Sequence, residues 1–225
     1  SIQRVPVILD CDNTMGVAGC DIDDGLALLF LLGCSDINLL GVTCAYGNSS
    51  QETVFSNTMR LLHEWGRDDI PCLRGSEDTG VRSAFLRNGI ITSGENSRLS
   101  DAASFLADKA MEYAGELCII AIGAMSNLAG AAETDSGFFE NVRTVSLMGG
   151  ITEELIVGGV HMDELNLSCD PGAALMVISE GKDVRIATAQ NSLSSYFGRD
   201  EFNAFLDSHP GKLSDMLRQE TSYWF

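Results

Sequence analysis

Short runs of β-branched and aliphatic residues alternate along the chain with longer segments in which apolar residues recur every third or fourth position. The short runs have the length and composition of strands, and the longer segments have the period of helices. The predicted strands cover residues 5–9, 39–43, 117–121, 144–148 and 184–187, and the predicted helices cover residues 24–32, 51–65, 101–113, 126–132 and 171–179. This alternation predicts an α/β fold with an open, mostly parallel sheet flanked by helices.

Nothing in the pattern divides the chain. No Pro, Gly or Ser-rich linker, charge block or internal repeat interrupts it, and a hydrophobic content of 45% is enough for one core. We therefore predict a single domain over residues 1–225. Residues 78–99 lack periodicity and are predicted to form a loop or flap, whereas residues 212–225 are predicted to form a helix. Ser126 is predicted to cap its helix, and Pro171 suits the first position of another.

The composition narrows the possible partners. A formal charge of −18 repels phosphate backbones and anionic lipids, so we expect neither a nucleic acid nor a membrane as partner. The longest apolar run, residues 26–32, is far shorter than the roughly 20 residues of a membrane span, and the N-terminus does not have the pattern of a signal peptide. Seven cysteines without CxxC spacing are interpreted as reduced and structural, which favours a cytoplasmic protein.

Aspartates crowd the end of the first predicted strand. Asp10 and Asp12 follow it, and Asp21, Asp23 and Asp24 lead into the next helix, which places five carboxylates within fifteen residues. Carboxylates packed this closely repel one another unless a cation neutralises them, and their hard oxygens suit Ca²⁺ or Mg²⁺. The alternative is that Asp23 and Asp24 cap a helix while the others are turn residues, but capping accounts for one or two acids and not for five.

Other polar residues follow later strands, where ligands bind in open parallel sheets. Asn48 comes after Gly47, and Met148 precedes two glycines that would allow close backbone approach to a ligand; either segment alone is equally typical of a simple turn. Glu164 and Asn166 precede a helix. Their side chains can hydrogen-bond a polyol, and the alternative is that both residues belong to a surface loop. We assign no role to any histidine.

Together these segments resemble the inosine/uridine-type nucleoside hydrolases. The resemblance rests on Ile-Leu-Asp-Cys-Asp at 8–12 with Asp-Asp at 23–24, Gly-Val-Thr at 41–43 with Gly-Asn at 47–48, Ile-Gly-Ala-Met-Ser-Asn-Leu-Ala at 122–129, Met-Gly-Gly at 148–150, and Glu-Leu-Asn at 164–166 with Asp-Pro at 170–171. It implies a Rossmann-like fold and hydrolysis of the N-glycosidic bond of a small-molecule ribonucleoside by a Ca²⁺-bound water.

The resemblance also implies roles for individual residues. Asp12 corresponds to the carboxylate that contacts the calcium and accepts a proton from the attacking water, Asp24 to a bidentate calcium ligand, and the backbone carbonyl of Ser126 to a main-chain ligand. Asp23 corresponds to the residue that holds the ribose hydroxyls. The remaining positions that match the family's ribose contacts are Asn48, Met148, Glu164 and Asn166, and Asp10 lies behind them.

The chain departs from the family's pattern in three places. Ten residues, 13–22, separate Asp12 from Asp23, where the family has three, and the residues that usually precede Glu-Phe-Asn are missing around 158–161. The family's later calcium-binding aspartate has no counterpart, so the chain apparently lacks the C-terminal segment. We then expect Leu217, Tyr223, Trp224 and Phe225 to form an apolar patch that pairs with another copy as a homo-oligomer.

Two other functions fit parts of the sequence. Residues 7–14 match the first motif of haloacid-dehalogenase-type phosphatases, in which Asp10 would attack phosphorus, although Gly-Gly follows Met148 where that family needs acids. The second alternative function is that of a non-catalytic relative that binds a nucleoside or ribose. Base preference is not predicted, because the family's contacts to the base lie largely in the flap and the C-terminal segment.

Overall fold

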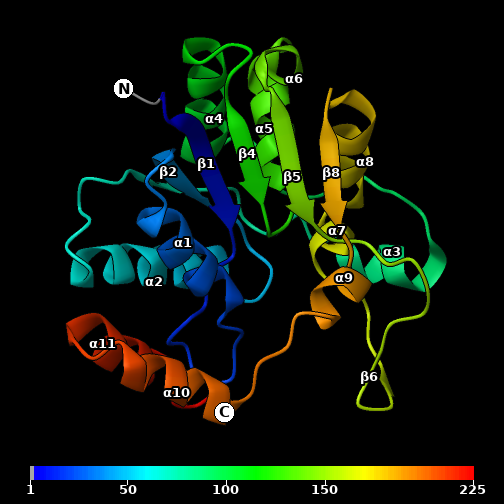
Figure 1. The fold of residues 1–225 in the computed structure, drawn as a ribbon. Helices are drawn as coiled ribbons and strands as arrows, with labels where there is room; N and C mark the ends of the chain where they lie inside the picture. The colour runs from blue at the N-terminus through cyan, green and yellow to red at the C-terminus, as the bar shows by residue number, and fades with distance from the viewer. Residues whose placement is uncertain (1–2) are drawn as a thin grey trace.

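A computed structural model describes residues 3–225. Its main sheet has the strand order β3-β2-β1-β4-β5-β8, and every neighbouring pair in it is parallel (Figure 1). The strands are β1 (Val5–Cys11), β2 (Ile37–Cys44), β3 (Cys72–Arg74), β4 (Cys118–Ala121), β5 (Thr144–Met148) and β8 (Val184–Ala187). The predicted α/β fold with an open parallel sheet is therefore confirmed.

Helices cover both faces of this sheet because successive strand residues point to opposite sides. Ile8 packs with α4 (Asp101–Glu112), α5 (Ser126–Thr134) and α8 (Pro171–Glu180), whereas Leu9 packs with α1 (Asp23–Gly33) and α2 (Gln51–Glu64). Short helices complete these layers, namely α6 (Phe138–Asn141), α7 (Asn166–Cys169) and α9 (Ala189–Leu193). Because the six strands of the main sheet are parallel, their carboxyl ends meet at one edge of the sheet (Figure 1).

The regular elements match the predicted ones to within a few residues, but the irregular segments hold more structure than was predicted. The segment 78–99 contains α3 (Arg82–Asn88), and a small hairpin of β6 (Ile156–Val157) and β7 (Val160–His161) projects from the sheet. Neither β3 nor the hairpin was predicted, since each strand has only two or three residues. Within residues 3–225, no helix combines the length and hydropathy needed to cross a membrane.

Helix starts test the capping predictions. Pro171 does stand at the start of α8, and the Asp170 side chain caps that helix by accepting a hydrogen bond from the Ala173 amide at 3.1 Å. The prediction for Ser126 was wrong. Met125 occupies the capping position of α5, and the Ser126 hydroxyl instead donates to the Asp170 carboxylate at 2.9 Å.

The last part of the chain folds back onto the N-terminal half. Two helices, α10 (Arg199–Ser208) and α11 (Lys212–Glu220), lie beyond α2 near the carboxyl edge of the sheet (Figure 1). Glu220 accepts two hydrogen bonds from Arg60 of α2, at 2.8 and 2.9 Å. Leu217 and Tyr223 pack against the cluster of Met15, Ile22 and Leu61.

The predicted apolar patch at residues 217–225 is therefore wrong in its main part. Leu217 and Tyr223 are covered by the N-terminal half, and the Phe225 ring packs against Phe197 and Phe202 at centroid distances of 6.1 and 5.3 Å. The predicted helix also ends at Glu220 rather than at residue 225. Only Trp224 keeps a large exposed surface.

Candidate active site

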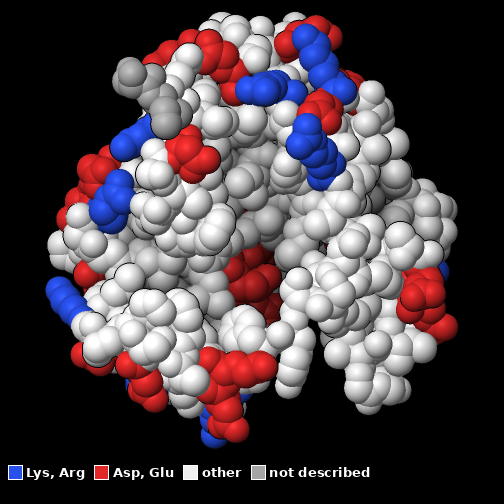
Figure 2. Space-filling model, viewed as in Figure 1, with Lys and Arg blue, Asp and Glu red and all other residues white. Residues whose placement is uncertain are grey.

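A cavity of about 560 Å³ opens at the carboxyl ends of the central strands. Figure 2 shows it as a hollow in the middle of one face with acidic side chains at its base. A cavity of this size is typical of small-molecule sites. Its lining includes acids and amides, Asp12, Asp21, Asp23, Asp24, Asn48, Asp163, Glu164 and Asn166, and a set of apolar and aromatic residues that includes Met148, Leu155, Met162, Leu193, Tyr196, Phe197 and Trp224.

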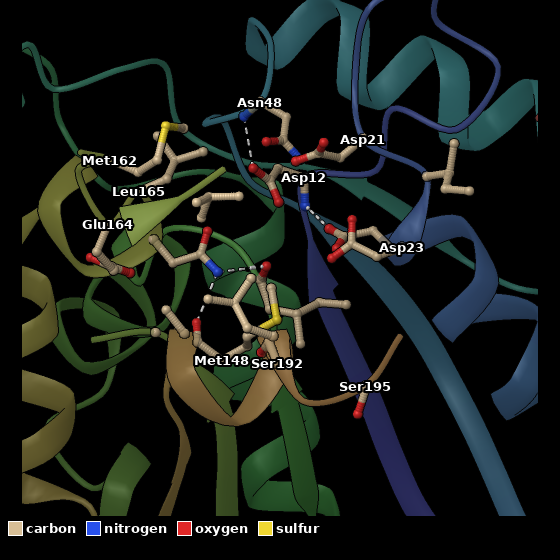
Figure 3. Close-up of a pocket in the computed structure, with 18 of the residues that line it drawn as sticks. Asp12, Asp21, Asp23, Asn48, Met148, Met162, Glu164, Leu165, Ser192 and Ser195 are labelled. Atoms are coloured by element: carbon tan, nitrogen blue, oxygen red, sulfur yellow. Dashed lines mark hydrogen bonds between the residues drawn. The ribbon is translucent and has the colours of Figure 1, made fainter. Parts of the chain in front are cut away.

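Asp12 and Asp24 form the deepest part of the cavity. Asp12 follows β1, and its backbone N–H donates to Oδ2 of Asp24 at 2.9 Å (Figure 3). Oδ2 of Asp12 accepts a hydrogen bond from the Asn48 amide at 2.8 Å. Gly47 permits this contact because it has a φ of 153°, and a Cβ at that position would collide with the Asp12 carboxylate.

The ten residues between Asp12 and Asp23, the inserted loop, are folded rather than extended. Met15 is fully buried against Ile22 and Leu61, and the Met15 carbonyl accepts a hydrogen bond from Asn57 of α2 at 3.0 Å. The Thr14 hydroxyl closes the loop by donating to the Asp21 carbonyl at 2.9 Å. The insertion therefore returns the chain to α1 so that Asp23 and Asp24 still meet Asp12.

Burial and mutual repulsion disturb the ionisation of these acids. Desolvation raises the pKa of Asp12 to about 6, and the nearby charge of Asp23 contributes to the rise. Burial raises the pKa of Asp24 well above its usual range, with further rises from the charges of Asp12 and Asp23. The pKa of Asp23 is also raised, by burial and by the charge of Asp21. Neither Asp23 nor Asp24 caps α1, which begins after Ile22 without a side-chain cap.

Asp10 lies behind the cavity and does not line it. It has no exposed surface, and its Oδ2 accepts hydrogen bonds from Thr43 at 2.6 Å and Asn127 at 2.9 Å, while its Oδ1 has no partner. Desolvation raises the pKa of Asp10 to about 7. A carboxylate enclosed in this way cannot reach a phosphate, so the geometry speaks against Asp10 as the nucleophile of a phosphatase.

Three of the predicted ribose contacts, Met148, Glu164 and Asn166, line the cavity beyond the ends of β4 and β5. The Asn166 amide donates to the carbonyls of Ile122 at 3.0 Å and Met148 at 2.8 Å, so it ties the ends of β4 and β5 together (Figure 3). The Glu164 carboxylate accepts hydrogen bonds from the backbone amides of Leu167 and Ser168 at the start of α7. Glu164 thus reaches the cavity while it also stabilises a helix end.

Ser126, predicted to offer its backbone carbonyl to the metal, is like Asp10 outside the cavity lining. Its hydroxyl contacts Tyr46 as well as Asp170. The flap, residues 78–99, also lies outside the lining. It is fixed to the α7–α8 region by hydrogen bonds from Arg82 to Ser168 and from Arg98 to Asp170.

Sequence reasoning missed the aromatic rim of the cavity, which consists of Tyr196, Phe197 and Trp224. Tyr196 and Phe197 follow α9 in a segment rich in serine, and Trp224 lies close to the end of the chain. The only available signal was the occurrence of large aromatic residues in polar segments that are not predicted to be buried. Such residues are typical of ligand or partner contacts.

The donor atoms at the cavity floor fit a divalent cation. They are carboxylate oxygens, the ligand type preferred by Ca²⁺ and Mg²⁺, and the mutual repulsion that raises the pKa of Asp24 is what a bound cation would relieve. Asp12 and Asp24 are the residues that would hold it. Within residues 3–225, no arrangement of three or more His, Cys, Asp or Glu side chains is close enough to form a complete protein ligand set.

Comparison with known proteins identifies the family. The family model described as inosine-uridine preferring nucleoside hydrolase matches residues 7–224, which include every strand end that lines the cavity. The chain belongs to this family. Among its relatives, uridine nucleosidase 1 of Arabidopsis thaliana is 32% identical over 180 residues, which are 73% of this chain and 52% of that protein.

Further relatives agree in fold. Probable uridine nucleosidase 2 of Arabidopsis thaliana is 28% identical over 96% of this chain and 68% of that protein. A solved plant nucleoside hydrolase superposes with a TM-score of 0.75 at 25% identity, covering 98% of this chain and 70% of that one. A purine-preferring ribonucleoside hydrolase from Gardnerella vaginalis has a TM-score of 0.77 at 22% identity and shows the same fold. The chain thus spans between 52% and 71% of the length of these relatives.

Proposed function

We propose that this protein hydrolyses the N-glycosidic bond of ribonucleosides to ribose and a free base. The observation that carries the proposal is the placement of Asp12 in a chain of this family. Asp12 lies at the floor of a nucleoside-sized cavity, with one carboxylate oxygen held by the Asn48 amide and its backbone N–H bonded to Asp24. This arrangement fixes the carboxylate while it still faces the cavity.

The chemistry requires a base for water and negative charge around the sugar. Breaking the bond between ribose and base develops positive charge on the sugar ring, which a pocket rich in carboxylates stabilises relative to the neutral nucleoside. Asp12 accepts the proton of the attacking water. Because its pKa is about 6, it is a stronger base than an ordinary aspartate and is still mostly ionised near neutral pH.

Other residues of the cavity orient the substrate. Asp23 accepts hydrogen bonds from ribose hydroxyls, and Asn48 and Asn166 hold the opposite edges of the ring. Asn166 is itself fixed by two backbone carbonyls, so its amide group has one orientation. A sugar held in one geometry between these groups reacts faster because less orientational entropy is lost at the transition state.

The proposed cofactor is Ca²⁺, held by Asp12 and Asp24. When bound, such an ion lowers the pKa of a coordinated water and fixes its position. A cation that binds only the folded protein at about 100 times its dissociation constant adds about 2.7 kcal/mol to the free energy of unfolding. Equal melting temperatures in saturating Ca²⁺ and in a chelator would contradict this part of the proposal.

One substrate panel tests the function. Uridine, inosine and a generic phosphomonoester are each incubated with the protein and Ca²⁺, and released ribose and phosphate are measured. Ribose from a nucleoside supports the proposal, and phosphate from the monoester would support the phosphatase alternative. Binding of uridine or inosine by calorimetry without release of either product would instead support a non-catalytic binding protein.

A further inference from the structure

Tyr46 is a buried residue to which the proposed function, on which this inference rests, gives no role. It lies two residues beyond the end of β2 and two residues before Asn48, and only 2% of its surface is exposed. Its ring packs with Ala124, Leu165 and Cys169. A phenolic hydroxyl enclosed among such neighbours needs hydrogen-bond partners, and Tyr46 has two.

A chain of hydrogen bonds runs through the Tyr46 hydroxyl. Its oxygen lies 3.0 Å from the Thr79 hydroxyl and 2.9 Å from the Ser126 hydroxyl. The Ser126 hydroxyl donates to Asp170 at 2.9 Å, and the two oxygens of Asp170 accept hydrogen bonds from Arg98 at 2.7 and 2.8 Å. Thr79, Ser126 and Asp170 are buried as Tyr46 is, so the chain is shielded from water.

The Arg98 end sets the direction of every bond in this chain. A carboxylate that binds a guanidinium through both oxygens is ionised and can only accept, so Asp170 takes the single proton of the Ser126 hydroxyl. Ser126 must then accept from Tyr46, and Tyr46 from Thr79. Each hydroxyl therefore has one defined donor and one defined acceptor, and removing the central hydroxyl breaks the chain on both sides.

The chain joins Tyr46 to both ends of the flap. Thr79 lies at the start of residues 78–99 and Arg98 at their end, and the Thr79 carbonyl accepts a hydrogen bond from the Glu95 amide at 3.1 Å. The two ends of the flap thus meet, and each of them is connected to Tyr46, directly through Thr79 and through Asp170 from Arg98. The Tyr46 side chain is held from two sides.

Only Gly47 separates Tyr46 from the amide that holds the proposed base. The Asn48 amide donates to Oδ2 of Asp12 at 2.8 Å, and a Cβ at Gly47 would lie 2.4 Å from the same oxygen (Figure 3). Glycine has more backbone freedom than any other residue. Without a fixed neighbour, Gly47 would allow the Asn48 amide to move away from the carboxylate.

We propose that Tyr46 is a positioning residue for Asp12, because its hydroxyl, held between Thr79 and Ser126, fixes the turn that presents the Asn48 amide to the carboxylate. Rates depend steeply on such placement, and a displacement of about 1 Å can lower a rate by about 10². Loss of one anchor, with Asp12 itself still present, should have a smaller effect of about tenfold.

Tyr46→Phe tests the effect on the rate, because it keeps the ring and its apolar contacts and removes only the hydroxyl. At saturating Ca²⁺, with uridine or inosine as substrate, kcat should fall about tenfold. In an Asp12→Asn background the same substitution should lower kcat by less than about twofold, because the group that it positions is gone. Tyr113→Phe is the matched control and should leave kcat unchanged, since Tyr113 lies between α4 and β4 at the opposite edge of the sheet from the cavity.

Hydrogen exchange tests the same placement without turnover. The exchange rate of the Asn48 amide is measured by NMR relative to the amides of β1, which report opening of the sheet. Tyr46→Phe should raise this relative rate about tenfold. Thr79→Val has the same shape as the native residue without its hydroxyl and should also raise it, whereas Thr79→Ser keeps a hydroxyl and should retain slow exchange.

An unchanged Asn48 exchange rate in either Tyr46→Phe or Thr79→Val would overturn the inference, as would a loss of kcat that is equally large with and without Asp12. If Tyr46→Phe does not fold, the comparison of Thr79→Val with Thr79→Ser decides. If the wild-type protein hydrolyses no nucleoside, the proposed function fails, whereas the exchange rates still decide whether Tyr46 holds the Asn48 amide against Asp12.

Discussion

The floor and the rim of the cavity are built in opposite ways. At the floor, Asp12 and Asp24 have almost no exposed surface, and Asp12 is hydrogen-bonded through both its backbone and its side chain. At the rim, Tyr196 and Trp224 are largely exposed, and the hairpin that carries Val157 has only a few paired residues. The floor fixes atoms that take part in chemistry, whereas the rim offers surface for recognition.

This contrast follows from the elements that carry each part. The floor comes from Asp12, directly after β1, and Asp24, in the first turn of α1, and β1 is paired with β2 over its whole length and with β4 over residues 7–10. The rim comes from α9, the hairpin and the end of the chain, which lie outside the sheet. Substitutions at the floor should therefore alter rate or stability, and substitutions at the rim should mainly alter which nucleoside binds.

The largest expected effect is on the rate. Asp12→Asn retains the shape of the side chain but removes the proton acceptor, and loss of a positioned base typically lowers the rate by about 10²–10⁴. Nucleoside hydrolysis at saturating Ca²⁺ measures this loss, and circular dichroism shows whether the variant folds.

Asp10→Asn provides the comparison within the same strand. It leaves the cavity lining intact, so it should affect stability more than the chemical step. If Asp10→Asn abolished hydrolysis while Asp12→Asn retained most of it, the roles assigned to these two residues would be wrong.

The next effect is a pH dependence of stability in the metal-free protein. The folded protein holds Asp10 and Asp12 at pKa values of about 7 and 6, above their usual value of 3.8, so it binds more protons than the unfolded chain between those limits. The free energy of unfolding should therefore fall as pH rises from about 4 to 7. The expected decrease is on the order of a few kcal/mol, the size that pKa shifts of this kind produce. Urea denaturation in a chelator at pH 5 and pH 7.5 measures this difference.

Two controls sharpen this measurement. The pKa of Asp170 is lowered because its hydrogen bonds with Arg98 outweigh the effect of burial. The stability that Asp170 contributes is therefore lost only at pH values below its usual pKa of 3.8, outside the pH range of this measurement. Asp10→Asn removes one of the acids with a raised pKa and should make the pH dependence less steep. A metal-free protein that is equally stable at both pH values would contradict the assigned ionisation.

The smallest effect concerns the contact that joins α11 to α2. Glu220→Gln replaces a mostly buried carboxylate that receives two hydrogen bonds from Arg60, and such a loss costs about 1–2 kcal/mol. Glu64→Gln is the matched control, since Glu64 bonds the same guanidinium from an exposed position and should cost at most about 0.5 kcal/mol. Thermal denaturation of both variants measures the difference in stability. Equal losses of stability in the two variants would show that the buried Glu220–Arg60 contact stabilises the fold no more than the exposed Glu64–Arg60 contact does.

The sequence was informative where structure repeats regularly. Strand residues 144–148 and 184–187 were predicted with their observed limits, because short runs of β-branched and aliphatic residues are typical of strands. Asp12, Asp24 and Asn48 were also predicted to share a site, and they meet at the cavity floor because parallel strands end at one edge of the sheet.

The sequence was uninformative where position depends on contacts between distant residues. Trp224 and Asp12 line one cavity although more than two hundred positions separate them, and no local pattern encodes that approach. The side chain of Ser126 was misjudged for a related reason. Capping was expected from its place at a helix start, but its hydroxyl bonds to Asp170 of another helix.

The contact between the inserted loop and the last helix also constrains the order of folding. Tyr223 accepts a hydrogen bond from the Gly16 amide at 3.2 Å, across a sequence separation of 207 residues. The cost of closing such a long loop of unfolded chain is recovered only once most of the protein is in place. During synthesis, the strands and helices of the N-terminal half can assemble while Met15 and Leu61 still await Leu217 and Tyr223. Among residues 3–225, the cavity should therefore become ordered late, and a nascent chain would form its sheet well before it formed this cavity.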